Sequence, residues 1–283
     1  RLDALTVVAD SRFSQQQYPQ AEEAYTELFK SLPPGDARYH PVLEQLAASV
    51  YKQGEAARNA DDLQTAALTF QRVSRVAPGA SIIANADYDA AAAYMVLQDW
   101  PDAETVLEDL RQRYPTHALI AGADKKLALA YQKNNQPAQA AEAYTRIAQR
   151  GSEALPTRRA AAWLAAQLYD QAGETPEAAD AYESYISIFP HPLDRAMSAR
   201  RRLADIALAN GHDDANYLHW LQEIIRTDGD AGAERTNATE QLAAQACLEL
   251  GRIDASKARA LVLTMPVSKS LPRRKILTEA AIA

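Results

Sequence analysis

Few residues of this chain have the types and spacing that chemistry at a site requires. His212, Asp213 and Asp214 come nearest to a metal-binding set. However, a zinc site takes three or four converging ligands with definite spacing, and these residues are adjacent in one predicted loop. The Asp61-Asp62 pair could act as acid and base, but carboxylates at the start of a predicted helix interact favourably with its dipole. We therefore interpret both groups as helix capping and solvated charge.

Motifs of catalysis and cofactor binding are also missing from the sequence. It contains no glycine-rich phosphate loop, no HExxH and no G-x-S-x-G. The single cysteine, Cys247, excludes an internal disulfide framework and a multi-cysteine metal site. Its place in a predicted helix indicates a small buried residue. We expect a protein that is not an enzyme, with no catalytic residues, no cofactor and no metal.

Composition and charge narrow the classes of partner. The net charge of −7 and the pI near 5.3 argue against general nucleic-acid binding, which needs a basic surface to neutralise phosphate. No run approaches the roughly 18 apolar residues of a membrane span. The sequence therefore predicts neither a nucleic-acid partner nor a direct membrane span in this segment. Because both ends read as the middle of a helix, the missing signal peptide says nothing about location.

Side chains in this chain would be positioned by helices arranged in a repeated hairpin. In residues 86–115, a first helix places Ala90 and Tyr94 on one face, and a second helix repeats such spacing from Ala103. Pro101 suits the first turn of the second helix, where a missing amide donor costs nothing. A Tyr-Pro dipeptide then ends the unit.

The small residue near the start of the second helix recurs with a period that chance does not produce. Intervals of 45, 37, 37, 38 and 37 residues separate the equivalent positions. A weaker seventh copy has Gly251 at the turn, Ser256 in the anchor place and Met265-Pro266 at its end. This pattern predicts stacked pairs of helices. The six anchors are Ala21, Ala66, Ala103, Ala140, Ala178 and Ala215.

With these positions the sequence resembles the tetratricopeptide repeat family. Leu127-Ala128 and Tyr131 match its first-helix pattern, and Ala178, Tyr182 and Pro190 match its second. The resemblance implies an all-α fold, a right-handed α-α superhelix of about seven helix-turn-helix repeats. The units exceed the usual length of about 34 residues. In this they resemble a periplasmic subgroup from Gram-negative bacteria, typified by the Tol-Pal coordinator protein and the barrel-assembly lipoprotein.

We expect one continuous solenoid over residues 1–266, because a lone helix pair cannot bury enough apolar surface without neighbours. Residues 267–283 are expected to begin a further, truncated helix. The expected repeats are residues 2–33, 41–78, 82–115, 119–151, 156–190, 193–228 and 236–266.

The resemblance also implies a concave wall formed by the first helices, and it assigns residues to that wall by register. Basic and aromatic side chains alternate there, so the groove could clamp an acidic peptide segment or a C-terminal carboxylate. Trp163 could equally be displaced core, and charged helix faces are usually only solvated. The residues assigned to the groove are Tyr51, Arg58, Asn85, Tyr88, Met95, Lys125, Lys126, Lys133, Trp163, Gln167, Arg200 and Arg201.

The expected function is that of a non-catalytic protein–protein interaction scaffold, which binds a protein or peptide in this groove. The periplasmic resemblance implies the cell envelope of a Gram-negative bacterium and a larger protein associated with a Tol- or ExbB-like system. The alternatives are a cytosolic chaperone-type adaptor and the docking arm of a larger enzyme. Apolar faces at the ends of the array could also stack on a second copy.

Overall fold

A computed structural model describes residues 2–209, 214–261 and 267–282. Within these ranges the chain is helical and contains no β-strand, which confirms the prediction of an all-α fold. Contacts between helices divide the chain into two compact units, Arg1–Gly151 (unit 1) and Ser152–Ala283 (unit 2). Each unit is described by itself. One continuous solenoid over residues 1–266 stays a prediction.

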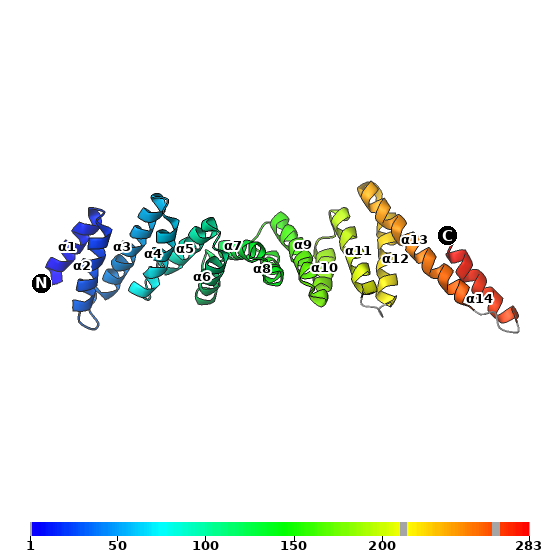
Figure 1. Ribbon diagram of the computed structural model, residues 1–283, viewed down its shortest axis with the longest axis horizontal. Helices are drawn as coiled ribbons and strands as arrows, with labels where there is room; N and C mark the ends of the chain where they lie inside the picture. The colour runs from blue at the N-terminus through cyan, green and yellow to red at the C-terminus, as the bar shows by residue number, and fades with distance from the viewer. Residues whose placement is uncertain (1, 210–213, 262–266, 283) are drawn as a thin grey trace. The chain divides into compact units, whose positions relative to one another are not determined.

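Unit 1 is a row of four helix pairs in which each helix packs against the next one along the chain (Figure 1). The pairs coincide with the first four predicted repeats. The helices are α1 (Leu2–Ser14), α2 (Tyr18–Ser31), α3 (Tyr39–Asn59), α4 (Leu63–Val76), α5 (Ile83–Leu97), α6 (Trp100–Arg113), α7 (Ile120–Lys133) and α8 (Pro137–Gln149).

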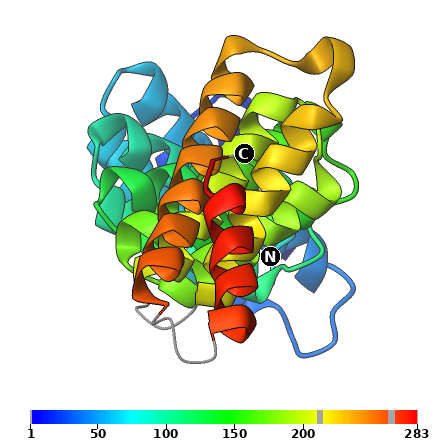
Figure 2. The ribbon, with the colours of Figure 1, turned by 90° about the vertical axis from the view of Figure 1, so that its right-hand side faces the viewer.

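Unit 2 begins with two pairs of the same kind, which coincide with the predicted repeats 156–190 and 193–228. In the third pair the first helix packs against both helices of the preceding pair, as α5 and α7 do in unit 1, and the second helix lies beside the first (Figure 2). The elements are α9 (Leu155–Ala172), α10 (Thr175–Ile188), α11 (Leu193–Ala209), α12 (Asp214–Gly229), the 3-10 helix η1 (Gly232–Glu234), α13 (Asn237–Ala260) and α14 (Val267–Ala280).

The turn expected at Gly251 is wrong. α13 continues through Gly251, and Ser256 is an exposed residue of the same helix. The sequence from 237 to 260 is rich in strong helix formers, so one interior glycine does not end the helix. A Cβ at residue 251 would lie 3.2 Å from the carbonyl oxygen of Ala281, so glycine here admits the chain after α14. The partner of α13 is therefore α14, and Met265-Pro266 lies outside the described residues.

Alanines at the anchor positions let the two helices of a pair approach closely, as predicted. The first five, Ala21, Ala66, Ala103, Ala140 and Ala178, are 0% exposed. The sixth anchor is wrong, because Ala215 is exposed and the buried face of α12 begins at Tyr217, which is 8% exposed. The register of this helix is therefore shifted by two residues from the predicted one.

Gly54 in α3 lies at a close approach between α3 and α4. A Cβ there would lie 2.7 Å from ring carbons of the buried Phe70 in α4. A side chain at this position would therefore push α3 and α4 apart.

The turn inside each of the first five pairs has one backbone geometry. The residue two positions before the second helix has a positive φ: 59° at Gln16, 62° at Asp61, 60° at Gln98, 55° at Asn135 and 78° at Gly173. The next amide then reaches back into the first helix; for example, the Asp99 N–H donates to the Tyr94 carbonyl at 2.9 Å. These left-handed residues satisfy carbonyls that the helix end would otherwise leave unpaired.

Candidate functional site

Eight predicted groove residues lie in unit 1 on α3, α5 and α7, and several are tied to one another. The Tyr51 hydroxyl donates a hydrogen bond of 2.5 Å to Asp89, and Arg58 forms an ion pair of 3.3 Å with the same carboxylate. Burial and then the bond to Asp89 raise the pKa of Tyr51. This part of the groove face is therefore a closed polar network that links α3 to α5.

The α7 side of this face is more basic. The Lys126 Nζ lies 5.2 Å from the centroid of the Tyr88 ring, a cation–π contact between α7 and α5. Lys125 and Lys133 are exposed on the same helix, as is Asn85 on α5, whereas Met95 packs partly against the core. The structure thus brings two of the predicted groove residues, Tyr88 and Lys126, into contact, and Lys125 and Lys133 are exposed on the same helix as Lys126.

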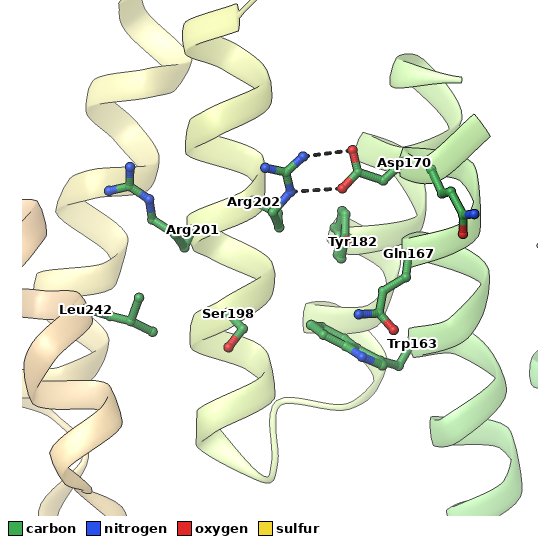
Figure 3. Close-up of a pocket in the computed structure, with 9 residues that line it drawn as sticks. Trp163, Gln167, Asp170, Tyr182, Ser198, Arg201, Arg202 and Leu242 are labelled. Carbon is green, nitrogen blue, oxygen red and sulfur yellow. Dashed lines mark hydrogen bonds and ion pairs between the residues drawn. The ribbon is translucent and has the colours of Figure 1, made fainter. Parts of the chain in front are cut away.

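A cavity of about 600 Å³ lies among α9, α10, α11 and α13 of unit 2 (Figure 3). Trp163 and Gln167 from α9 line it, together with Arg201 from α11 and Leu242 from α13. Three predicted groove residues, Trp163, Gln167 and Arg201, therefore meet here. We call this space the Trp163 cavity.

Trp163 belongs to both the core and the cavity wall. Its ring meets Tyr182 edge-to-face at a centroid distance of 5.8 Å and Tyr185 at 5.3 Å. The guanidinium of Arg195 lies 5.3 Å from its centroid. Because the ring is only partly buried, one part is anchored by the tyrosines and another remains available to a ligand.

The charges around the Trp163 cavity are largely compensated within the protein. Arg202 donates two hydrogen bonds to Asp170, at 2.8 and 2.9 Å (Figure 3), and the bonds to this carboxylate raise the pKa of Arg202. Arg201 binds Glu249 at 2.8 Å and Asp205 at 2.8 Å. An acidic ligand would have to compete with these three carboxylates.

Arg200 does not lie with its neighbour Arg201. It lines a second cavity, of about 290 Å³, together with Arg226 of α12. Consecutive residues of an α-helix are rotated by about 100°, so two neighbours seldom point into one site. The groove assignment places Arg200 by counting from Ala215, whereas the buried face of α12 begins at Tyr217.

Several residues of the Trp163 cavity were not predicted from the sequence. Asp170, Ser198, Arg202 and Leu242 line it, and Asp170 and Arg202 are 32 residues apart in the chain. Asp170 follows Gln167 by three positions on one helix, so helical periodicity was a usable signal for it. Leu242 has no such signal, because the sequence predicts a turn at Gly251 where the structure has one continuous helix, α13.

The reactive candidates of the sequence have other roles where the structure describes them. Asp62 is the N-cap of α4: its carboxylate accepts the Thr65 N–H at 3.1 Å, and hydrogen bonding to Thr65 lowers the pKa of Asp62. Cys247 is exposed, so its predicted burial is wrong; the neighbouring Ala246 is the buried residue. His212 and Asp213 lie outside the described residues.

Two kinds of site are absent from the described ranges. No group of three or more His, Cys, Asp or Glu side chains there could hold a metal ion. None of the helices in those ranges combines the length and the apolar character needed to cross a bilayer.

Comparison with known families finds tetratricopeptide repeats at residues 85–117, which hold most of α5 and all of α6, and at residues 125–191, which hold most of α7 and all of α8 to α10. No curated protein matches the sequence. The chain is similar to the nearly identical TPR-like repeats of a Podosopora anserina protein assigned as a kinesin light chain, with 20% identity, coverage of 66% of this chain and 94% of that one, and a TM-score of 0.38. It is also similar to a tetratricopeptide repeat protein from Parabacteroides merdae, with 14% identity, coverage of 100% and 99%, and a TM-score of 0.35.

Proposed function

Because the chain carries tetratricopeptide repeats over residues 85–117 and 125–191, we propose that it is a non-catalytic scaffold that binds a segment of a partner protein in the Trp163 cavity. Repeat arrays of this kind serve as protein-interaction scaffolds. The observation that supports this site is the convergence of Trp163, Gln167 and Arg201 on one cavity of about 600 Å³.

The lining of the Trp163 cavity favours an apolar or aromatic anchor on the partner. The partly exposed Trp163 ring and Leu242 supply apolar surface, while the exposed amides of Gln167 and Gln171 can bond a peptide backbone. The arginines are already paired with carboxylates, so they contribute little attraction for an acidic anchor. Binding therefore depends on stacking and on amide hydrogen bonds.

We propose an acidic segment as the ligand of the groove face in unit 1. Lys125, Lys126 and Lys133 give α7 a basic surface, and Tyr88 adds an aromatic contact beside Lys126. At this exposed surface the attraction should weaken with salt, because exposed charges are screened.

Selection of peptides from a random library tests the Trp163 cavity even when the natural partner is not identified. Selected peptides should lose at least about tenfold in affinity with Gln167→Ala, the loss of roughly 1.4 kcal/mol expected for a hydrogen bond at a binding site. Gln167 is exposed and so can be replaced without disturbing the fold. Trp163→Ala should weaken binding further.

Ile188→Ala is the matched control, because Ile188 is a 57% exposed apolar residue outside the cavity. It should leave affinity unchanged. Peptides that bind equally well to the wild type, Gln167→Ala and a folded Trp163→Ala variant would exclude this cavity as the site. Lys126→Glu provides the corresponding test for the unit 1 face.

We also propose the Gram-negative cell envelope as the location, in association with a Tol- or ExbB-like system. The support is the length of the repeats and their Tyr-Pro or Phe-Pro endings at 114–115 and 189–190. Fractionation of cells that express the complete gene tests the proposal. Recovery of the product only in the cytosol would contradict it and favour an adaptor in that compartment.

A further inference from the structure

A buried ion pair recurs in unit 1 at a fixed spacing. Asp87 and Arg113 are 26 residues apart and are joined at 2.8 Å, and Asp124 and Arg150 are joined with the same separation of 26. In each case the carboxylate is on the first helix of a pair and the arginine is at or just past the end of the second. The two carboxylates are 3% and 2% exposed, so each pair places an anion against a guanidinium inside the repeat.

In unit 2 the two residues at this spacing of 26 are both cations, Arg200 on α11 and Arg226 on α12. Arg226 is bound instead by Glu223 of its own helix, at 2.6 and 3.0 Å. Arg200 donates to the carbonyl of Ala196 at 3.2 Å, and its Nε is buried without a hydrogen-bond partner among the residues that the structure describes. This repeat thus has a guanidinium at the position where the repeats of Asp87 and Asp124 have a carboxylate.

Arg200 lies at a cavity that can receive a ligand. The space of about 290 Å³ is also lined by Arg226, Thr227 and His191. Burial lowers the pKa of Arg200; the charge of Glu223 opposes this and that of Arg226 adds to it. Glu223 bonds Arg226 and not Arg200, so among the described residues no carboxylate is bonded to the Arg200 guanidinium. An anion that reaches Arg200 would therefore offset the cost of burying its charge.

The edge of this cavity restricts the anion that can enter. Asp230, with a side chain 73% exposed, lies 3.5 Å from Arg226, and Glu234, 53% exposed, lies 2.8 Å from His191. These carboxylates would repel a dianion such as phosphate more strongly than a monoanion. A single carboxylate therefore fits better than a phosphate.

We propose that this space, the Arg200 cavity, binds one carboxylate group, supplied by an acidic side chain of a partner protein. The carboxylate takes the part that Asp87 and Asp124 play in unit 1, and it bonds the free donors of Arg200. The site lies apart from the residues that line the Trp163 cavity, so it does not depend on the peptide site proposed there.

Arginine side-chain NMR tests this proposal directly. The wild-type protein is titrated with sodium acetate in place of sodium chloride at constant ionic strength, and the Nε–H resonance of Arg200 is followed. We expect a saturable shift of that resonance, with a smaller response to inorganic phosphate at the same concentration. No saturable shift with acetate would overturn the site, and a tighter response to phosphate would overturn the assignment to a carboxylate.

Arg200→Asp supplies a second, independent readout. This substitution recreates the Asp/Arg combination of unit 1, so we expect a higher unfolding midpoint than the wild type and loss of the dependence on acetate. Arg252→Asp is the control, because Arg252 is exposed on α13 and the net charge changes equally. The proposal requires acetate to raise the unfolding midpoint of the wild type more than that of Arg200→Asp. Equal increases in the two proteins would contradict it.

Discussion

The two units differ in how their interiors are organised. In unit 1 one cluster of buried apolar residues runs from Ala9 in α1 to Leu127 in α7. In unit 2 the buried residues form separate clusters, one that includes Tyr182 and one that includes Met197. The regular repeats of unit 1 thus share one cluster over most of their helices, whereas the Trp163 and Arg200 cavities both lie in unit 2.

The two units also differ in charge at one repeat position. In unit 1 the buried carboxylates Asp87 and Asp124 both have arginine partners. In unit 2 Arg200 stands at the corresponding place without a carboxylate of its own helix pair. The Arg200 cavity thus marks a departure from the repeat pattern, whereas the groove face of unit 1 and most of the Trp163 cavity lie on helices that follow it.

The largest predicted effect concerns a buried pair of unit 1. Asp124→Ala should lower the free energy of unfolding by about 3–5 kcal/mol, because it leaves Arg146 and Arg150 without their shared carboxylate. Urea unfolding measures the loss. Glu142→Ala, at an exposed position of α8, should change stability by less than about 0.5 kcal/mol. Equal losses in the two variants would mean that the buried pair is not what distinguishes unit 1.

A second prediction uses pH to separate the units. Burial, with help from the charge of Asp109 and opposed by Arg113, raises the pKa of Asp87 from its ordinary 3.8 to about 6. The folded state then holds this proton more tightly than the unfolded state. The contribution of Asp87 to stability is therefore present below pH 4 and is lost as the pH rises to about 6, by about 2–3 kcal/mol.

Asp87→Asn should remove that part of the pH dependence, since an amide does not titrate. The measurement is the unfolding free energy at several pH values between 4 and 7. Arg200, which stands at the equivalent place in unit 2, does not change charge in this range. An unchanged slope in the Asn variant would show that the pH dependence arises elsewhere.

A third prediction tests how tightly the helices of unit 1 approach. Gly54→Ala should destabilise by about 1–3 kcal/mol, because the new Cβ would lie 2.7 Å from the buried Phe70 ring. Gly122→Ala places a Cβ 2.7 Å from the Tyr88 hydroxyl, the end of a side chain that can move. There the gain in helix propensity, up to about 1 kcal/mol, should offset the clash. Thermal unfolding of both variants measures the two changes in stability. An equal loss of stability in Gly54→Ala and Gly122→Ala would contradict the prediction.

The predictable part of the fold is the part where one residue type has one structural consequence. A small residue at the closest approach of two helices is required wherever the pattern is regular, so five anchors were placed correctly. The prediction at Ala215 is wrong because the buried face of α12 begins two residues later, at Tyr217. Gly251 failed because a glycine can end a helix or admit a neighbouring chain, and which of these happens depends on α14.

The candidate site was predictable only as a face of a helix. Register assigns Trp163, Gln167 and Arg201 to one face, and the three line one cavity. Neighbouring residues of a helix are rotated by about 100°, so Arg200 lines another cavity. The bond from Arg202 to Asp170 joins residues 32 apart, and no local pattern predicts which carboxylate an arginine reaches. The pairing of charges around the Trp163 cavity therefore cannot be predicted from the sequence.

The smallest predicted effect compares one turn position in the two units. Gln98 and Gly173 have φ values of 60° and 78° at the same place before the second helix. Only glycine adopts this region without strain, so Gly173→Ala should lower stability by about 1 kcal/mol. Gln98→Gly should change it by only a few tenths, because relief of strain is opposed by the greater freedom of glycine in the unfolded chain. Urea unfolding of both variants measures the difference. Gly151→Ala is the control, because nothing lies within 4 Å of a new Cβ there and the φ of Gly151 is not positive. A Gly173→Ala variant as stable as the wild type would show that the turn of unit 2 can adjust where those of unit 1 hold a strained residue in place.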